Sequence, residues 1–252
     1  MEVVILGSGT STGVPVIGCS CEVCTSDDPR NRRTRSSILV EHAGAYILVD
    51  TATDFRAQAI ANNIPKIDAV CYTHTHADHV HGIDDLRCFN KLKGGAIPCY
   101  GSPATCESLQ RNFPYIFKPS EGAGWRPHLE PNAVTGDFDL FGLKVAPIEI
   151  EHGKSMIYGY RFGDVAYLTD CSGIPGYSME KLRGLKLLII GAIRYQPHPS
   201  HFSLGQSVEI IEALKPERAL LTHLGHSFDQ EKTGAELPPN TGLAYDGLRI
   251  TL

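Results

Sequence analysis

The stretch Thr73-His74-Thr75-His76-Ala77-Asp78-His79 decides the fold class of this sequence. It follows an apolar run at residues 69–72 and precedes a stretch with helical character. An H-x-H-x-D-H series at a strand-to-helix turn directs several imidazoles and carboxylates to one place, and these groups suit Zn, Mn or Fe. A surface histidine cluster without a partner would not need four ligand-type residues so close together after a buried strand. We therefore expect a metal centre at this turn, with neighbouring ligands that diverge toward two ions.

Three later residues stand in positions that match this turn. His152 follows an apolar run at residues 143–150, Asp170 ends the run that reaches Thr169, and His223 ends the run that reaches Thr222. Side chains at strand ends lie at the rim of a sheet, where the active sites of mixed α/β proteins collect. Each residue alone could equally be structural. As a set that follows an H-x-H-x-D-H series, they indicate ligands for two metals.

Composition sets broad limits on the protein. The chain has 252 residues, of which 42% are hydrophobic and 20% charged, and its net charge is −5. This composition predicts a globular protein of one to two domains and excludes intrinsic disorder. The charge argues against a general nucleic-acid coat but leaves a local basic patch open. No run approaches the ~20 apolar residues of a membrane span, and the first residues lack a signal-peptide pattern. We expect a cytoplasmic protein, where disulfides are rare, so the eight cysteines are thiols or metal ligands.

Strands and helices alternate along the chain. Short apolar runs rich in β-branched residues predict strands at residues 3–6, 37–40, 46–49, 69–72, 143–146, 165–168, 187–190 and 219–221. Helices are predicted from a cap at Thr53 to 62, from 78 to about 90, from 104 to about 112, and from a Ser203–Gln206 capping box to Pro216. This mixture predicts an α/β protein with one continuous domain, residues 1–252. The loop 118–131, rich in Gly and Pro, is expected to be a surface excursion that could overhang a site.

The order of these motifs resembles the metallo-β-lactamase superfamily of binuclear hydrolases, over nearly the whole chain. The resemblance implies a four-layer αββα sandwich with the site at one edge. It also implies that His74, His76 and His152 hold one metal and that Asp78, His79 and His223 hold the other, with Asp170 bridging both. Asp50 matches an aspartate that supports the metal loop, although it is equally well an ordinary cap of the strand that it ends. The resemblance implies that the catalytic residues are Asp78, Asp170 and His201.

Such a pair of divalent ions, Zn or Mn, implies a concrete chemistry. Two metals about 3.5–4 Å apart share a bridging hydroxide at neutral pH and act together on an in-line displacement. They polarise the electrophile, deliver the nucleophile and neutralise the developing charge, so no nucleophilic Ser or Cys is required. The ligand set does not fix which metal is present.

A second cluster, Cys19-Ser20-Cys21-Glu22-Val23-Cys24, places three thiols in a C-x-C-x-x-C run in a predicted loop, residues 19–24. A closed structural zinc site needs a fourth ligand, and His226, three residues beyond His223, is the natural candidate. A redox thiol cluster and unrelated buried thiols are the alternatives. This pattern resembles the PhnP family, the phosphodiesterases of the carbon–phosphorus lyase pathway. The resemblance implies hydrolysis of small phosphodiesters, with five-membered cyclic ribose phosphates as the preferred class, and suggests a homodimer, while the sequence leaves the oligomeric state open.

Four further residues bear on the substrate. His201 aligns with the family's catalytic histidine outside the metal ligands, and an imidazolium there could protonate the leaving alkoxide. His198 and Arg194 are weaker candidates for substrate contact, although an arginine can bind phosphate through two N–H groups. Gly191 departs from the family, because many relatives carry an aspartate there, which casts doubt on an identical substrate.

Three other functions remain open at this stage. An RNA-processing endonuclease of the tRNA 3′-end type uses nearly the same ligands, but it needs a surface that follows phosphates, and the net charge of −5 argues against one. Thioester or lactone hydrolysis would use the same metals. A non-catalytic metal-binding accessory protein is disfavoured by the complete ligand set and His201.

Overall fold

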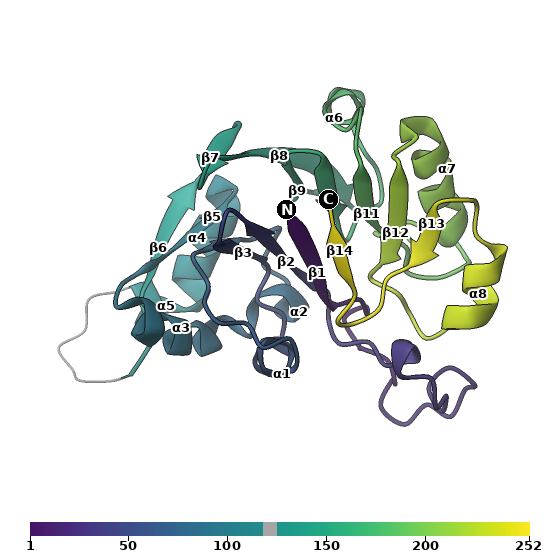
Figure 1. Cartoon of the computed structure of the whole chain (residues 1–252), viewed down its shortest axis with the longest axis horizontal. Helices are drawn as coiled ribbons and strands as arrows, with labels where there is room; N and C mark the ends of the chain where they lie inside the picture. Colours follow the sequence, from purple (N-terminus) through teal and green to yellow (C-terminus); the bar gives the residue numbers. More distant parts are fainter. Residues whose placement is uncertain (118–124) are drawn as a thin grey trace.

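Two seven-stranded sheets form the centre of the molecule in a computed structural model that describes residues 1–117 and 125–252 (Figure 1). The first sheet has the order β14 (Arg249–Thr251), β1 (Glu2–Gly7), β2 (Ser37–His42), β3 (Ala45–Val49), β4 (Ala69–Cys71), β5 (Ile97–Gly101) and β6 (Leu129–Ala133). The second has the order β13 (Thr241–Leu243), β12 (Arg218–Thr222), β11 (Leu187–Gly191), β10 (Val165–Leu168), β9 (Ser155–Phe162), β8 (Leu143–His152) and β7 (Phe138–Leu140).

Helices cover the outer face of each sheet. The helices on the first sheet are α1 (Phe55–Ala61), α2 (Ala77–Val80), α3 (Leu86–Lys93), α4 (Pro103–Asn112) and α5 (Pro114–Phe117), with the 3₁₀ turn η2 (Ile83–Asp85). Those beside the second are α6 (Gly176–Lys181), α7 (Leu204–Leu214) and α8 (Gln230–Glu236), and the 3₁₀ turn η1 (Pro29–Asn31) lies in the loop after β1. The expected four-layer αββα sandwich is confirmed.

The apolar runs are continuous because both faces of each central strand are buried. Along β1, Val3 and Ile5 pack between the two sheets, whereas Val4 and Leu6 pack under the helices of the first sheet. In β11, the odd-numbered residues Leu187 and Ile189 face the inter-sheet core and the even-numbered ones face α6 and α7. Strand periodicity therefore sorts a single apolar run into two different cores.

Strand direction brings the predicted ligands to one edge. Strands β3, β4, β5 and β6 run parallel, and so do β10, β11, β12 and β13. Asp50 directly follows β3, and the turn at residues 73–79, called the histidine turn below, follows β4. Asp170 follows β10 closely, and His223 directly follows β12. Because the carboxyl ends of parallel strands share one edge, residues far apart in sequence meet there.

Two predicted helices differ from the structure. Thr53 does not cap α1, because the N-cap residue is Asp54. The hydroxyl of Thr53 donates instead to the carbonyl of Ala77. The helix expected from 78 to 90 is divided into α2, η2 and α3. The break centres on Gly82, whose N–H donates to the Thr51 carbonyl, and a Cβ there would lie 2.1 Å from the Ala52 oxygen. This close approach of two backbone segments has no local signal beyond the glycine itself.

Other local expectations have mixed outcomes. The Ser203–Gln206 capping box is confirmed, with both reciprocal bonds present. In the loop predicted at 118–131, residues 129–131 belong to β6, and 118–124 lie outside the described residues. Cys88 is exposed on α3. Among the described residues, no helix combines the length and apolar character needed to cross a membrane.

Candidate binuclear metal centre

Two clusters of potential metal ligands meet at the edge where the parallel strands end. The first comprises His74, His76, His152 and Asp170, and the second comprises Asp78, His79, Asp170 and His223. Within each cluster the donor atoms lie within 4.8 Å of one another. All seven residues expected to hold the active-site metals are therefore brought together, and Asp170 belongs to both groups.

The carboxylate of Asp170 divides its two oxygens between the clusters. Its Oδ2 lies 3.9 Å from Nε2 of both His74 and His152. Its Oδ1 lies 3.1 Å from Nε2 of His79 and 3.2 Å from a ring nitrogen of His223. Two donors about 2.1 Å from one tetrahedral ion lie about 3.4 Å apart. These separations therefore fit a carboxylate with one oxygen directed to each of two ions.

Unsatisfied polar atoms support a metal at this site. His74 Nε2, His79 Nε2 and Asp78 Oδ2 are buried without a hydrogen-bond partner within the protein. Buried polar atoms are almost always paired, so three orphaned atoms in one place indicate a missing partner. Imidazole nitrogens and carboxylate oxygens are borderline-hard donors, which suits Zn²⁺ or Mn²⁺. The residues present thus fit a pair of divalent cations.

Asp50 holds the histidine turn in place. It is fully buried, and its Oδ2 accepts a 2.8 Å hydrogen bond from Nδ1 of His79. The same carboxylate accepts from both the backbone N–H and the hydroxyl of Thr73. Since an ionised carboxylate can only accept, His79 carries its proton on Nδ1 and presents Nε2 toward Asp170. The interpretation of Asp50 as an ordinary strand cap does not account for these contacts.

Three hydroxyl groups contact His223, and one of them belongs to Thr169, 3.5 Å from its Nδ1. The Ser36 hydroxyl lies 3.2 Å from its Nδ1, and the Thr10 hydroxyl lies 3.3 Å from its Nε2. His152 is oriented in a similar way, because its Nδ1 donates to the Ser200 carbonyl at 2.7 Å. No sequence signal distinguishes these partners, since they come from loops distant along the chain.

Three site residues adopt an uncommon backbone conformation. Asp50, Asp170 and His223 have φ values of 63°, 54° and 55°. A non-glycine residue with positive φ is uncommon and costs conformational free energy unless the surrounding structure holds it. Each lies at or just past the end of a buried strand, where the left-handed turn directs its side chain to the common edge. Three of the eight non-glycine residues with positive φ among the described residues thus lie at the candidate site.

Burial and neighbouring charges shift most of the cluster residues toward the protonation states that metals require. His79 is the exception, because Asp170 and Asp50 raise its pKa well above the usual range although burial opposes this. Burial lowers the pKa of His74 well below its usual range, and the neighbouring His79 lowers it further. Burial also lowers the pKa of His76 and His223. Burial opposes ionisation of Asp170, but the adjacent His223 and His79 hold its pKa well below the usual value. Neutral imidazoles around an ionised carboxylate are the form that binds divalent metals.

His201 lies against the clusters without belonging to either. Its ring stacks on His223, with centroids 5.0 Å apart and planes 13° apart, and its Nδ1 lies 3.9 Å from Asp170 Oδ2. Its side chain is 14% exposed, against 3% for Asp170. Burial lowers the pKa of His201 to about 3 in the protein alone. This ring is placed where a substrate bound at the two clusters would meet it.

The weaker substrate candidates have different surroundings. His198 lies 5.0 Å from His201 between ring centroids, and its Nδ1 accepts from the N–H of Ser200. Arg194 donates to the carbonyls of Gln196 and Pro197, so these N–H groups stabilise its own loop. At Gly191 a Cβ would lie 3.4 Å from the backbone nitrogen of Asp170, an ordinary contact. A side chain at Gly191 would thus lie in van der Waals contact with Asp170, His223 and Leu168, so the glycine does not face open space.

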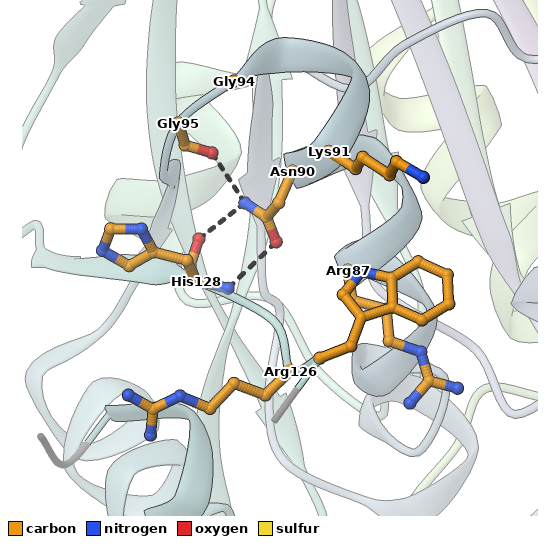
Figure 2. A pocket seen from close by; sticks show the side chains of 8 residues that line it. Arg87, Asn90, Lys91, Gly94, Gly95, Arg126 and His128 are labelled. Atoms are coloured by element: carbon orange, nitrogen blue, oxygen red, sulfur yellow. Dashed lines mark hydrogen bonds between the residues drawn. The ribbon is translucent and has the colours of Figure 1, made fainter. Parts of the chain in front are cut away.

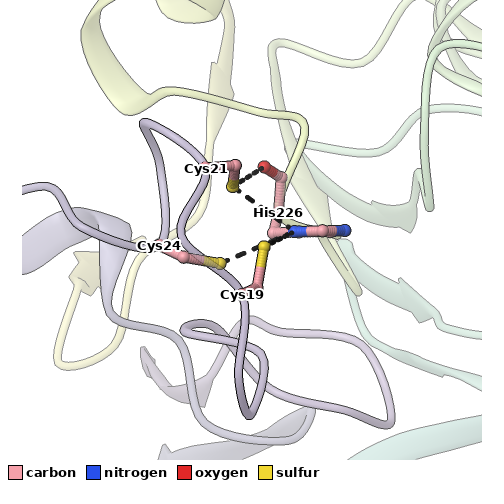
Figure 3. A group of neighbouring side chains, drawn as sticks. All are labelled: Cys19, Cys21, Cys24 and His226. Carbon is pink, nitrogen blue, oxygen red and sulfur yellow. Dashed lines mark hydrogen bonds between the residues drawn. The ribbon is translucent and has the colours of Figure 1, made fainter.

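The cysteine cluster forms a separate site with His226. Figure 3 shows the sulfurs of Cys19, Cys21 and Cys24 gathered around one edge of that ring, with separations of 3.3, 3.5 and 3.5 Å from its Nδ1. Sulfur and nitrogen ligands of one tetrahedral zinc lie about 3.6 Å apart. A hydrogen bond from the backbone N–H of Cys24 lowers the pKa of Cys21 to about 6, which favours a thiolate, whereas burial raises the pKa of Cys24 to about 11. The four predicted residues thus fit a Cys₃His zinc site.

Comparison with known proteins places this geometry in a family. The model of the β-lactamase superfamily domain matches residues 45–224. A solved structure described as a new diphosphatase from the PhnP family is 46% identical, covers 99% of this chain and 96% of that chain, and superposes with a TM-score of 0.93. The structure of Zn²⁺-bound PqqB from Methylobacterium extorquens covers both chains completely with a TM-score of 0.82, but at 22% identity it shows the fold alone.

A curated relative from Porphyromonas gingivalis extends the comparison. It carries the name octanoyltransferase and is 39% identical over 100% of this chain. The chain spans about half the length of the curated relatives it matches, 52% in this case. The family model, the whole-chain structural match and the two ligand clusters agree with one another. The chain belongs to the β-lactamase superfamily and is a PhnP-like hydrolase of the metallo-β-lactamase fold.

Proposed function

We propose that this protein is a binuclear metal-dependent phosphodiesterase that hydrolyses small phosphodiesters, with cyclic ribose phosphates as the favoured class. The observation that carries the proposal is the placement of Asp170, which directs one carboxylate oxygen to each ligand cluster and lies beside His201. The metal-binding roles of His74, His76, Asp78, His79, His152, Asp170 and His223 belong to the same proposal. When bound, two divalent ions supply Lewis-acid polarisation of a phosphoryl oxygen and make a water nucleophile available at neutral pH.

The chain's own residues orient the metal ligands and supply a proton to the leaving group. Asp50 and Ser200 fix the rings of His79 and His152, so that their donor nitrogens point to the site. His201 is proposed to hold the proton that the leaving alkoxide takes up. An anionic phosphate bound beside this ring favours its protonated form, because an opposite charge within about 4–6 Å stabilises the imidazolium.

A phosphoanhydride is the second candidate substrate. The PhnP-family structure at 46% identity is described as a diphosphatase, and the identity extends over nearly the whole of both chains. A diphosphate bond presents the same charged phosphoryl oxygens to the site. This neighbour's substrate class is therefore worth testing directly.

Phosphorus NMR of the Mn-loaded protein distinguishes the candidates. Ribose 1,2-cyclic phosphate and a dinucleoside diphosphate are incubated separately with wild type and with Asp170→Ala. Ring opening by the wild type alone supports the phosphodiesterase, whereas turnover of the diphosphate alone supports the second candidate. If neither changes while elemental analysis finds both metals, the substrate class is wrong.

Two comparison substrates test the other superfamily reactions in the same assay. Octanoyl thioester addresses the relative that is named octanoyltransferase, whose activity as a whole protein does not carry over to a chain half its length. A structured tRNA precursor addresses the RNA-processing endonuclease. Turnover of either one faster than the phosphodiester would replace the proposal. Failure of every substrate would favour the non-catalytic accessory protein.

We also propose that Cys19, Cys21, Cys24 and His226 hold one structural zinc. Cys21→Ser is expected to remove one zinc per chain and to lower Tm by roughly 5 °C or more, since about 2–4 °C corresponds to 1 kcal/mol in a chain of this size. Elemental analysis and calorimetry measure the two effects. Cys88→Ser, an exposed thiol on α3, is the control and should change neither. Unchanged zinc content in Cys21→Ser would contradict the assignment.

Asp50→Asn tests the support of the histidine turn. Loss of the charged acceptor for His79 Nδ1 is expected to weaken metal binding about 10–100-fold, as for other residues that orient a metal ligand. Competition with a chromogenic chelator measures the affinity. Asp137→Asn, an exposed aspartate paired with Lys144, serves as the control. Equal affinities in the two variants would make Asp50 a structural residue only.

Three broader expectations stay predictions. They are a single domain over residues 1–252, a homodimer, and a cytoplasmic location without a membrane partner. The small phosphodiester substrate belongs to the proposal made above for the metal centre.

A further inference from the structure

A second pocket lies away from the ligand clusters, with a cavity volume of about 500 Å³. It is lined by Arg87, Asn90, Lys91, Gly94, Gly95, Trp125, Arg126 and His128 (Figure 2). This volume is within the range of small-molecule sites, about 300–1,000 Å³. Neither the two ligand clusters nor the cysteine site includes any of these residues.

The pocket lies at the opposite edge of the first sheet from the metal centre. Gly94 and Gly95 precede β5 and His128 precedes β6, so they lie at the amino ends of parallel strands. The histidine turn follows the carboxyl end of β4, which runs parallel to β5. A ligand in this pocket would therefore occupy a site distinct from the proposed reaction centre.

An exposed tryptophan forms the aromatic wall. Trp125 is 61% exposed, which is unusual for the largest apolar side chain. The guanidinium carbon of Arg87 lies 5.3 Å from the indole centroid and Nζ of Lys91 lies 6.0 Å from it. Cations over an indole ring are attracted by its negative face. The indole of Trp125 thus has both exposed aromatic surface and two cations over its ring.

Asn90 fixes the backbone of the pocket. Its amide nitrogen donates to the carbonyls of Gly95 and His128, and its amide oxygen accepts from the N–H of His128. Figure 2 shows the Asn90 amide between these two backbone segments. The two glycines leave open space beside the backbone, because a Cβ on either would meet no atom within 4 Å. A flat group has room to lie there.

Positive charge in the pocket is only partly neutralised. Arg87 pairs with Asp84 at 2.5 Å. Lys91, in contrast, has no carboxylate within 4.0 Å among the residues that the structure describes, and it is exposed. This local excess of positive charge occurs in a chain with a net charge of −5. An anionic group at Lys91 would gain an attraction that no carboxylate of the described residues supplies.

We propose that this pocket binds a nucleotide unit, with its base stacked on Trp125 and its phosphate at Lys91 and Arg87. A base has a flat aromatic face that stacks on an exposed indole, and its phosphate carries the charge that the two cations attract. An inorganic anion would not use the exposed indole surface, and an uncharged aromatic would not use the positive charge of Lys91. The proposal does not depend on the function of the metal centre.

Fluorescence provides a direct test, because Trp125 is the only tryptophan of the chain. The full-length protein is titrated with AMP, adenosine or inorganic phosphate, and N-acetyltryptophanamide in parallel corrects for absorbance. We expect AMP to quench the emission saturably, adenosine to bind more weakly, and phosphate to leave the emission unchanged. A short oligoadenylate is titrated in the same way and is checked afterwards to be intact. Tighter binding of AMP indicates a site for a free nucleotide, and tighter binding of the oligoadenylate indicates a site for a nucleotide within a single strand.

Two variants connect the signal to the pocket. Lys91→Gln is expected to weaken AMP about fivefold and to reduce the effect of added salt. Lys93→Gln, on the same helix but outside the pocket, is the matched control and should bind as wild type does. Trp125→Ala, measured by calorimetry, should weaken AMP about tenfold or more through lost stacking.

Three results would overturn the proposal. They are the absence of saturable quenching by both AMP and the oligonucleotide at 10 mM nucleotide, quenching by phosphate equal to that by AMP, and equal AMP affinity in wild type and Trp125→Ala. Because the signal comes from Trp125, these outcomes are independent of whether the metal centre hydrolyses any substrate.

Discussion

Asp170→Ala is expected to lower kcat/KM at least ~10³-fold and to reduce the active-site metal content from two ions toward one or none. The physical reason is the division of its two oxygens, 3.1 and 3.2 Å from the second cluster and 3.9 Å from two histidines of the first. Loss of this carboxylate would remove the negative group that both proposed metal positions share, and each 1.36 kcal/mol of lost transition-state stabilisation is tenfold in rate. Steady-state kinetics with elemental analysis measures both effects.

Two further variants keep this prediction decisive. Asp170→Asn preserves the volume of the buried side chain, so a loss of activity in a variant with an unchanged Tm cannot be attributed to misfolding. Asp164→Asn removes an exposed aspartate paired with Lys186 and should leave metal content and rate unchanged. Full activity with two bound metals in Asp170→Asn would refute the bridging role.

His201→Ala is expected to lower kcat about 10²–10⁴-fold, the usual contribution of general acid catalysis, while both metals stay bound. Its ring stacks on His223 and lies 3.9 Å from Asp170, but it belongs to neither ligand cluster. An ester of p-nitrophenol needs little protonation of its leaving group, so its hydrolysis should fall much less than that of an alkyl ester. The comparison of these two substrates measures the proton donation itself.

The neighbouring His198 offers a matched comparison for that experiment. It lies on the same loop, with its ring 5.0 Å from that of His201 and its Nδ1 toward Ser200. We expect His198→Ala to lose less than about fivefold, which is about 1 kcal/mol. The role of His201 as proton donor would be excluded if His201→Ala slowed the hydrolysis of both esters equally. It would also be excluded if His198→Ala lost as much activity as His201→Ala.

Much of the site follows from local sequence patterns. The H-x-H-x-D-H turn and the positions of His152, Asp170 and His223 at strand ends sufficed to predict which residues meet, because parallel strands deliver their carboxyl ends to one edge. The capping box at Ser203 was predicted for a similar reason, since its bonds span only three residues. Interactions that close within a few residues, or that repeat with strand topology, leave a readable pattern.

Other features depend on contacts between distant segments. The basic cluster at Arg30, Arg32, Arg33 and Arg35 has one buried member, because Arg33 is 2% exposed and donates to the Phe228 carbonyl. Asp246, near the end of the chain, accepts from both the N–H and the hydroxyl of Ser8 and of Thr34, next to the loops that reach His223. Neither residue has a sequence neighbour that predicts its partner.

The sequence by itself predicted eight of the strands and the residues that meet at the candidate site, because periodicity and ligand spacing are local properties of the chain. The αββα class and the division of these residues into two clusters were implied by the resemblance to the metallo-β-lactamase superfamily. Only the tertiary structure decided which oxygen of Asp170 faces which cluster, that Ser36 and Thr10 contact His223, and that Lys91 and Trp125 share a pocket. These relations depend on the packing of two sheets and their loops against one another. Packing of this kind is set by the shape of the whole core and leaves no periodic trace along the chain.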